Sequence, residues 1–344
     1  MSDKGFDYWE FFVGECERAG APLYAQITRG ICGDAEIKAL GARCKPGQPP
    51  ANILLAAVHF LLLRGAEHPL RRFYPSLNGG KRIAGEDPFP HFRDFVTSYR
   101  DDLMPLIETQ VTNTNEVARS SALHAGFRAI AAESSEPLSL IEIGPSAGLN
   151  LNWDRYRIRY VRDGESFESG PSNAALTIDC ELQGANVPPH GAPPKIASRI
   201  GLECNPVDLN DPDQRDWLKA LIFADHVARF ARLEKAIDLY RNHPAEIRAG
   251  DALVNLADAI ARVPEDRPVV VYHTFVIYQF TEEMRETLDN ILTMAGLRRP
   301  IWRLSLEGSL KGENILSLGR YHDGAKEVRP LARAHPHGVW LEWL

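Results

Sequence analysis

The sequence predicts an α/β protein with an all-helical N-terminal domain at residues 1–133 and a three-layer α/β domain at residues 134–344. Up to about residue 133, apolar residues recur at helical spacing, with proline- and glycine-bearing breaks between the helices. From residue 138 onward, short β-type runs alternate with amphipathic helices. Within that part, segment 268–277 (PVVVYHTFVI) is apolar enough for a parallel strand that is buried on both faces.

In the N-terminal domain, helices are expected at residues 8–19, 50–65, 91–110 and 115–133. Segment 51–63 is apolar nearly all round, so we expect it to form the buried centre of this domain. His59 lies within that segment, and we interpret it as a core histidine with satisfied hydrogen bonds rather than as a ligand.

In the α/β domain, the predicted helices span residues 211–240, 252–263 and 281–296. Asp211 and Pro212 suit the N-cap and the first helical position, while Thr281 and Gly296 suit the two ends of the last helix. Strands are expected at 138–144, 155–161, 175–182, 196–203, 246–251, 268–277, 301–308, 313–324 and 338–344, with the last two forming an antiparallel pair.

The composition excludes several classes of function. A net charge of −7 argues against a general binder of nucleic acid, which depends on clustered Lys and Arg. The most apolar segment is too short to cross a bilayer, and the N-terminal residues lack the pattern of a signal peptide. The five cysteines form no C-x-x-C pair, so neither disulfides nor a zinc site is expected. We therefore expect a reduced, cytoplasmic protein that acts on a small molecule; the oligomeric state is not readable from the sequence.

A glycine-bearing turn follows the first predicted strand, in the stretch LIEIGPSAGLN at residues 140–150. A turn of this kind between a strand and a helix allows a ligand to approach the backbone and the amides that open the helix. The candidate binding residues of this turn are Glu142, Gly144, Pro145, Ser146, Gly148 and Asn150. The alternative is a structural turn, because the dinucleotide motif would require glycine where Ser146 stands.

Two further acidic residues follow predicted strands. Glu203 ends the strand at 196–203, and Asp251 ends the strand at 246–251. Ligands of open parallel sheets bind at the carboxyl ends of the strands, where a carboxylate can hold a ribose. Taken singly, each acid is equally well explained as a helix cap. The residues beside them that join the candidate cofactor-binding set are Cys204, Asn205, Gly250 and Ala252, together with His273 on a later strand.

These three sites resemble the class I S-adenosylmethionine-dependent methyltransferase superfamily. EIGPSAG (142–148) is similar to its acidic-x-Gly-x-Gly-x-Gly loop with Ser146 replacing the middle glycine, and Glu203 and GDA (250–252) match the acids after the second and third strands. The resemblance implies a three-layer Rossmann-like methyltransferase sheet with an antiparallel terminal hairpin, S-adenosylmethionine as cofactor, and the helical domain as a lid over the pocket. The whole chain also resembles an uncharacterised bacterial family of unknown function, through stretches such as TNTNEVARSSAL and ARAHPHGVWLEWL.

The chain departs from the superfamily in the spacing of its acids. The acid after the second strand normally follows the glycine loop by about twenty residues, whereas here residues 151–195 intervene, and we interpret them as a β insertion. If the run at 155–161 were instead the second strand of the sheet, Asp163 rather than Glu203 would be the ribose acid.

The resemblance also indicates where chemistry would occur. His273 lies at the end of the fourth main strand beside Tyr272 and Thr274, and a histidine there could act as a general base. The alternative for His273 is a structural hydrogen bond at the sheet edge. Asn115 and Arg119 lie just before the first strand, and we expect Arg119 to contact a carboxylate of the cofactor or substrate. No metal site is expected, including at HPHG (335–338).

Two other functions remain open. The chain could bind S-adenosylmethionine or another nucleotide without catalysis, or it could be an NAD(P)-dependent oxidoreductase that uses the same loop for the pyrophosphate. We rank the oxidoreductase last, because the loop does not complete the glycine pattern of that motif.

Overall fold

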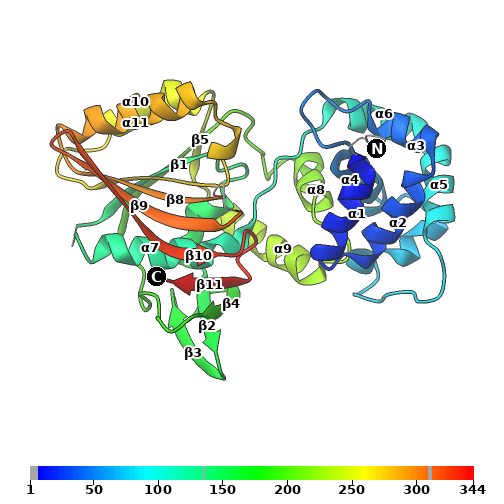
Figure 1. Cartoon of the computed structure of the whole chain (residues 1–344), viewed down its shortest axis with the longest axis horizontal. Coiled ribbons are helices and arrows are strands. Elements are labelled where there is room, and N and C mark those ends of the chain that lie inside the picture. The colour runs from blue at the N-terminus through cyan, green and yellow to red at the C-terminus, as the bar shows by residue number, and fades with distance from the viewer. Residues whose placement is uncertain (1–6, 135, 309–311) are drawn as a thin grey trace, which may run out of the picture. The chain divides into compact units, whose positions relative to one another are not determined.

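The computed structural model describes residues 7–134, 136–308 and 312–344, and these form two compact units (Figure 1). The helical unit contains residues up to 114 and residues 208–234; the sheet unit contains residues 115–207 and 235–344. The division therefore differs from the predicted boundary at residue 133. Segment 115–133 belongs with the sheet, and segment 208–234 returns to the helical unit, where Trp217 and Ala220 are buried in the core.

The core of the helical unit forms around α4 (Pro50–Leu63), as its apolar sequence predicts. Ten of the fourteen residues of α4 are buried. His59 is fully buried, and its ring nitrogens pair with Ala220 O at 3.1 Å and Ser76 Oγ at 2.9 Å, which confirms the interpretation as a core histidine. The remaining α-helices of this unit are α1 (Tyr8–Arg18), α2 (Pro22–Cys32), α3 (Ala35–Gly41), α5 (Phe89–Ser98), α6 (Arg100–Thr109), α8 (Pro212–Ala220) and the first part of α9 (Val227–Asn242). Short 3₁₀ turns lie at η1 (Pro69–Phe73) and η2 (Pro75–Leu77).

Where the structure describes it, the sheet unit is built on one sheet of eleven strands, in the order β3-β2-β4-β11-β10-β9-β8-β7-β1-β5-β6. The strands are β1 (Leu138–Ile143), β2 (Arg157–Arg162), β3 (Glu165–Ser169), β4 (Thr177–Gln183), β5 (Ile196–Glu203), β6 (Glu246–Ala249), β7 (Val269–Thr274), β8 (Ile301–Gly308), β9 (Asn314–His322), β10 (Ala325–Ala334) and β11 (Trp340–Trp343). The sheet is mostly parallel, and the chain is thus a mixed α/β protein, as predicted in outline.

The parallel half of the sheet is covered by helices on both faces. α10 (Ala252–Ala261) and α11 (Glu282–Gly296) share a core with Val269 and Val271 of β7. The intervening residues of β7 face the other way, and there Phe127 of α7 (Ser120–Ala131) lies edge-on to Tyr272, with ring centroids 5.2 Å apart. All six residues of β7 are buried, as the apolar run predicts for a strand between two helical layers.

The inserted residues extend the same sheet. β2 and β3 form a hairpin, β2 pairs with β4, and β4 pairs with β11, so the insertion joins the far end of the sheet. The prediction that 313–324 and 338–344 pair with each other is wrong, because β10 lies between β9 and β11 and is antiparallel to both. Glu203 ends β5, the strand beside β1, whereas Asp163 lies in the turn between β2 and β3.

The described residues of the sheet unit also contain three short 3₁₀ turns: η3 (Val117–Arg119), η4 (Leu149–Arg155) and η5 (Ile277–Gln279). Among the helices of the described residues, none combines the length and apolar character required to span a bilayer.

Candidate functional site

The candidate site lies along the edge of the sheet where β1, β5, β6 and β7 end. These strands are parallel, with β1 between β5 and β7, and β6 beyond β5. Among these parallel strands, β5 and β6 lie on one side of β1, and β7 and β8 lie on the other. Within this group, the order of the strands therefore reverses at β1, although the chain passes through β2, β3 and β4 at the far end of the sheet before it reaches β5.

Glu142 and Tyr272 form a buried pair at the centre of this edge. They are register partners in β1 and β7, and the Tyr272 hydroxyl donates to Oε2 of Glu142 at 3.0 Å. Burial is the largest influence on the carboxyl and raises the pKa of Glu142 to about 8; the Tyr272 hydrogen bond lowers it and the nearby charge of Glu203 raises it. Glu142 is therefore mostly protonated at neutral pH.

Glu203 is held by two backbone amides. The Ser146 N–H donates to Oε2 at 2.8 Å, and the Asn205 N–H donates to Oε1 at 3.0 Å. To direct its amide toward Glu203, Ser146 adopts a φ of 56°, which is unusual for a residue with a side chain. The carboxylate is half-buried, and Cys204 and Asn205 beside it are exposed. The loop after β1 is thus bound to the end of β5.

The glycines of this loop are packed against neighbouring side chains. Gly144 and Gly148 have φ values of 69° and 78°, which glycine tolerates best. A Cβ at Gly144 would lie 2.6 Å from Val276, and one at Gly148 would lie 2.8 Å from Ile247. Glycine is needed here for both backbone conformation and packing within the chain. Side chains of the protein therefore occupy the space beside these two glycines, where the sequence predicted open access for a ligand to the loop backbone.

The third acid is a helix cap. Asp251 is exposed, and its carboxylate accepts from the Leu253 N–H at 2.7 Å to begin α10, ahead of the buried Ala252. The preceding Gly250 has a φ of 125° and donates its N–H to the Glu203 carbonyl at 2.9 Å. Asp251 and Glu203 both act electrostatically on Cys204, so the two acids lie along one rim.

Residues just before α7 connect this edge to other loops. The Asn115 side chain accepts from the Leu149 N–H at 2.9 Å, and Asn150 accepts from Ser120 Oγ at 3.1 Å. Arg119 donates to the Pro336 carbonyl at 3.0 Å and to the Thr274 carbonyl at 3.3 Å. Arg119 therefore lies at the end of β7, and its positive charge acts on Glu142.

His273 does not join the Glu142 side of the sheet. Because it is one residue from Tyr272 along β7, its side chain points to the opposite face. Its Nδ1 lies 2.6 Å from Oε1 of Glu307, and its Nε2 accepts from Nε of Arg303 at 3.0 Å. The ring is fully buried, and burial is the main cause that lowers the pKa of His273. Because both nitrogens are engaged, this geometry favours the structural hydrogen bond that was the alternative to a base.

The sequence interpretation missed Glu307 and the loop that it holds. Oε1 of Glu307 also accepts from the Val276 N–H at 3.0 Å and the Ile277 N–H at 3.3 Å. Glu307 thus fixes the segment whose Val276 packs on Gly144. Its signal in the sequence was of the same kind as that of Glu203, an acid at the end of a predicted strand.

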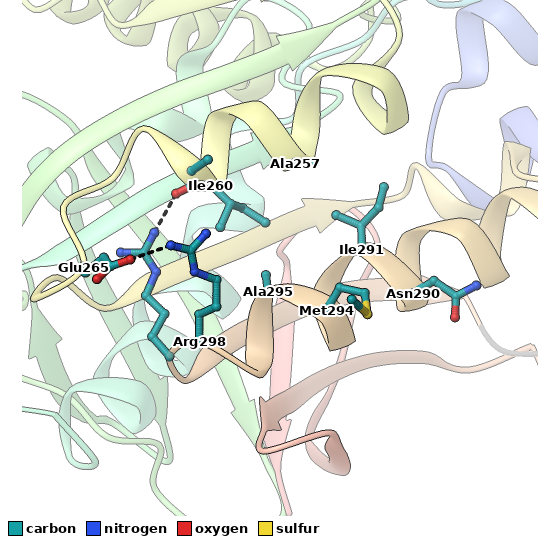
Figure 2. A pocket seen from close by; sticks show the side chains of 10 residues that line it. Ala257, Ile260, Glu265, Asn290, Ile291, Met294, Ala295 and Arg298 are labelled. Atoms are coloured by element: carbon teal, nitrogen blue, oxygen red, sulfur yellow. Dashed lines mark hydrogen bonds and ion pairs between the residues drawn. The ribbon is translucent and has the colours of Figure 1, made fainter.

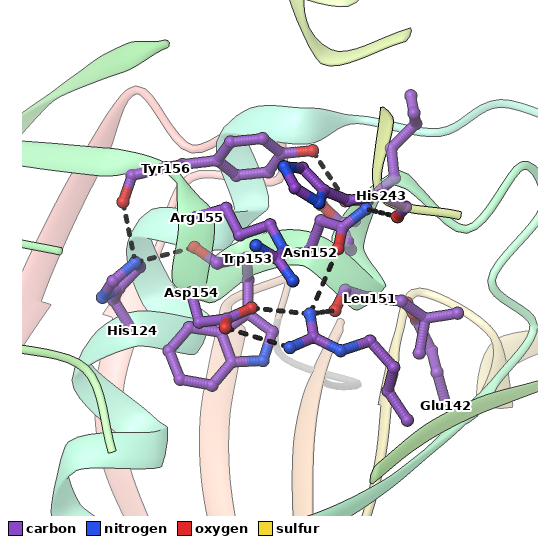
Figure 3. A network of polar contacts seen from close by, with 12 residues as sticks. His124, Glu142, Leu151, Asn152, Trp153, Asp154, Arg155, Tyr156 and His243 are labelled. Atoms are coloured by element: carbon purple, nitrogen blue, oxygen red, sulfur yellow. Dashed lines mark hydrogen bonds and ion pairs between the residues drawn. The ribbon is translucent and has the colours of Figure 1, made fainter. Parts of the chain in front are cut away.

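A second missed group supports the loop from the β5 side (Figure 3). Arg199 of β5 forms an ion pair with Asp154 at 2.8 Å and donates to the Leu151 carbonyl at 2.7 Å. Both side chains of the ion pair are mostly buried. Nε2 of His124 contacts the Trp153 carbonyl at 2.8 Å. These contacts fix η4, the continuation of the glycine loop.

Unusual backbone conformations also occur at this edge. Ser146 and Phe275, which follow β1 and β7, both have a φ of 56°. Asp163 and Asp323 have positive φ as well, but each precedes a glycine in a hairpin turn, where this conformation is ordinary. Strained residues outside such turns are frequent at functional sites. This observation favours the edge beside β1 and β7 as the functional region.

Within the described residues, no three His, Cys, Asp or Glu side chains converge in a way that could hold a metal ion.

Comparison with known proteins identifies a family. No curated protein and no solved structure matches the chain. One family model matches residues 8–343, and the chain therefore belongs to the family described as an uncharacterized protein conserved in bacteria (DUF2332).

Proposed function

We propose that this chain is an S-adenosylmethionine-dependent methyltransferase that acts on a small or medium-sized molecule. The observation that carries the proposal is Glu203, a half-buried carboxylate held by two backbone amides at the end of the strand next to β1. The proposed cofactor site lies at the edge formed by β1, β5 and β7.

The order of the parallel strands supports a nucleoside site at this edge. Numbered by their place in the chain, β6, β5, β1, β7 and β8 are the third, second, first, fourth and fifth strands of the parallel series. This is the order of doubly wound nucleotide-binding sheets, which bind ligands at the carboxyl ends where the order reverses. The acid that binds ribose in such sheets follows the second strand, which is the position of Glu203.

The residues of the edge fit a cofactor of this type. A carboxylate has about four acceptor positions, and the two amides on Glu203 leave the others for the two ribose hydroxyls. Glu203 and Asp251 also make the rim acidic, which suits a positively charged sulfonium compound. We assign the nucleoside to Glu203 and not to the loop backbone, because the Ser146 amide is already used and Val276 packs on Gly144.

When bound, S-adenosylmethionine supplies a methyl group activated for transfer. The task of the protein would be to hold and orient the reactants, which can lower the barrier by several kcal/mol. The buried Glu142–Tyr272 pair gives the floor of the edge a fixed shape, and Arg119 holds the end of β7 through Thr274.

A second candidate function is binding without methyl transfer. It is favoured by His273, whose two ring nitrogens are both engaged on the face opposite to Glu142 and Tyr272. A reaction at this edge that needs a base would have to use another group.

Calorimetric titration with S-adenosylmethionine and with NAD tests the cofactor. We expect S-adenosylmethionine to bind, and Glu203→Gln to weaken its affinity at least tenfold. Glu165→Gln, an exposed change in β3, serves as the matched control and should leave affinity unchanged. Thermal unfolding would establish that both variants are folded. Binding of NAD alone, or unchanged affinity in Glu203→Gln, would overturn the proposal. If S-adenosylmethionine binds, release of S-adenosylhomocysteine over a metabolite panel distinguishes the enzyme from the binder.

A further inference from the structure

A cavity of about 420 Å³ lies in the groove between α10 and α11, on the side of these helices that does not face the sheet (Figure 2). Its apolar walls are Ala257, Ile260 and Ala261 from α10 and Ile291, Met294 and Ala295 from α11, and Asn290 of α11 adds one polar side chain to the lining. Pockets for small molecules typically measure 300–1,000 Å³ and have mostly apolar walls. The groove has the size and lining of such a pocket.

The apolar surface continues around the groove. Met294 in its wall is 65% exposed, and Val254 of α10 and Leu297 after α11 are 77% and 54% exposed. The opposite side of the same helices already covers the sheet through residues such as Leu256 and Leu292. The folding of the sheet unit therefore does not account for the apolar outer side, and clustered exposed apolar residues commonly mark a binding surface.

One end of the groove is basic. Arg298 and Arg299 follow α11 and line the cavity together with a single acid, Glu265. Arg298 pairs with Glu265 at 2.8 Å, and both side chains are more than 70% exposed. Arg299 reaches the end of α10, where its Nη2 donates to the Ile260 carbonyl at 2.6 Å. Two guanidinium groups and one carboxylate leave this end with a net positive charge.

The influences on Arg299 support this description of the charge. Burial is the main cause that lowers the pKa of Arg299; Glu265 raises it, and the adjacent Arg298 lowers it. The two guanidinium groups thus repel each other, and the charge of Glu265, the ion-pair partner of Arg298, also acts on Arg299. A second carboxylate would reduce that repulsion. The exposed Arg298–Glu265 ion pair contributes little to stability, so Arg298 can exchange its partner at low cost.

We propose that the groove between α10 and α11 binds a small amphiphile with an apolar chain and one carboxylate, of the type of a medium-chain fatty acid. The chain would lie between Ala257 and Met294, and the carboxylate would lie at Arg298. Two features select this class of ligand: the long wall is apolar and the positive charge is confined to one end. Methionine adapts to flexible chains, and arginine binds carboxylates through two parallel hydrogen bonds.

The experiment uses dodecanoate and its uncharged analogue dodecanol, titrated calorimetrically into the full chain below the concentration at which micelles form. Dodecanoate should bind at one site per chain. Ala257→Phe fills the exposed middle of the groove and should lower the affinity for both compounds at least tenfold. Glu283→Phe adds similar bulk at an exposed position near the start of α11, outside the cavity lining, and is the matched control, with affinity expected to change less than twofold.

The charge is tested separately. Arg298→Gln should weaken dodecanoate at least fivefold and leave dodecanol unchanged. Arg262→Gln is the control, because Arg262 is an exposed arginine that directly follows α10 and does not line the cavity. This change should leave the affinity for both compounds unchanged. Thermal unfolding checks that each variant is folded.

Four outcomes would overturn the proposal. The first is that dodecanoate does not bind, and the second is that Ala257→Phe binds it with the affinity of the parent. The third is that Arg298→Gln loses affinity for dodecanoate and dodecanol equally, and the fourth is that the protein binds anionic lipid vesicles but not dodecanoate. Sedimentation provides a further check, because a dimer that Ala257→Phe dissociates would make the groove an interface between two copies. None of these outcomes depends on S-adenosylmethionine, so this proposal and the proposed function can fail independently.

Discussion

Gly144→Ala tests why the loop after β1 contains glycine. In the structure, Gly144 has a φ of 69°, and a Cβ there would lie 2.6 Å from Cγ2 of Val276. The substitution therefore adds two costs, one from the backbone conformation and one from overpacking. If the glycine instead served only to let a ligand approach, the space above it would be open and the second cost would be absent.

The two costs can be estimated separately. A left-handed conformation costs an L-residue about 1–2 kcal/mol, and overpacking of a filled site costs about 1–3 kcal/mol. Gly164, in the β2–β3 turn, has a φ of 84°, and a Cβ there would meet no neighbouring atom within 4 Å, so Gly164→Ala carries the first cost alone. We expect Gly144→Ala to destabilise the sheet unit by about 2–5 kcal/mol and Gly164→Ala by about 1–2 kcal/mol.

The assay is scanning calorimetry of the parent, the two single variants Gly144→Ala and Val276→Ala, and the double variant, with Gly164→Ala as the reference. For a unit of this size, each kcal/mol shifts Tm by about 2–4 °C. Since the two units can melt separately, Gly164→Ala also identifies the transition of the sheet unit. Val276→Ala removes the clash, so the double variant should be about 1–3 kcal/mol more stable than the sum of the single changes predicts. A coupling below about 0.5 kcal/mol, or equal effects of Gly144→Ala and Gly164→Ala, would refute the reasoning.

Two further predictions concern the buried acids. Between pH 4.5 and about 8, folded Glu142 holds a proton that the unfolded chain releases, because burial raises its pKa to about 8. The parent should therefore lose stability as pH rises through this interval. The free energy of unfolding of Glu142→Gln, measured from urea midpoints, should rise relative to that of the parent by roughly 1 kcal/mol per pH unit. Parallel pH profiles of the two proteins would contradict the assignment. Glu307→Ala should speed hydrogen exchange at the amides of Val276 and Ile277 at least tenfold, while β1 stays protected, because Glu307 accepts from both; unchanged exchange would show that it does not hold this loop.

Much of the fold was predictable because it depends on local signals. Asp211 caps α8 with Pro212 as its first residue, and Thr281 caps α11, as their sequences indicate. The burial of β7 follows from its continuous apolar run. The location of Glu203 at the candidate edge was also predictable, because an acid that ends a buried parallel strand must lie at the carboxyl edge of the sheet.

The errors arise where a segment depends on distant partners. β10 contains four charged residues and Pro330, so its own sequence does not indicate a strand; its pairing with β9 and β11 makes it one. Likewise, the apolar side of α8 shows that this helix is buried but not which unit covers it. In the structure, Trp217 lies in the helical core, and the chain returns to a unit it had left at residue 114.

The site assignment depended on one quantity that the sequence does not contain, the register between β1 and β7. Consecutive residues of a strand face opposite sides, so only one of Tyr272 and His273 can lie on the side of Glu142. A shift of one residue would place His273 beside Glu142 and Tyr272 against α11. The observed register pairs Glu142 with Tyr272, and it places His273 next to Arg303 and Glu307. The face that carries Glu203 at the end of β5 therefore presents a buried carboxyl–tyrosine pair and not a histidine, and a search for a base should begin with groups on that face.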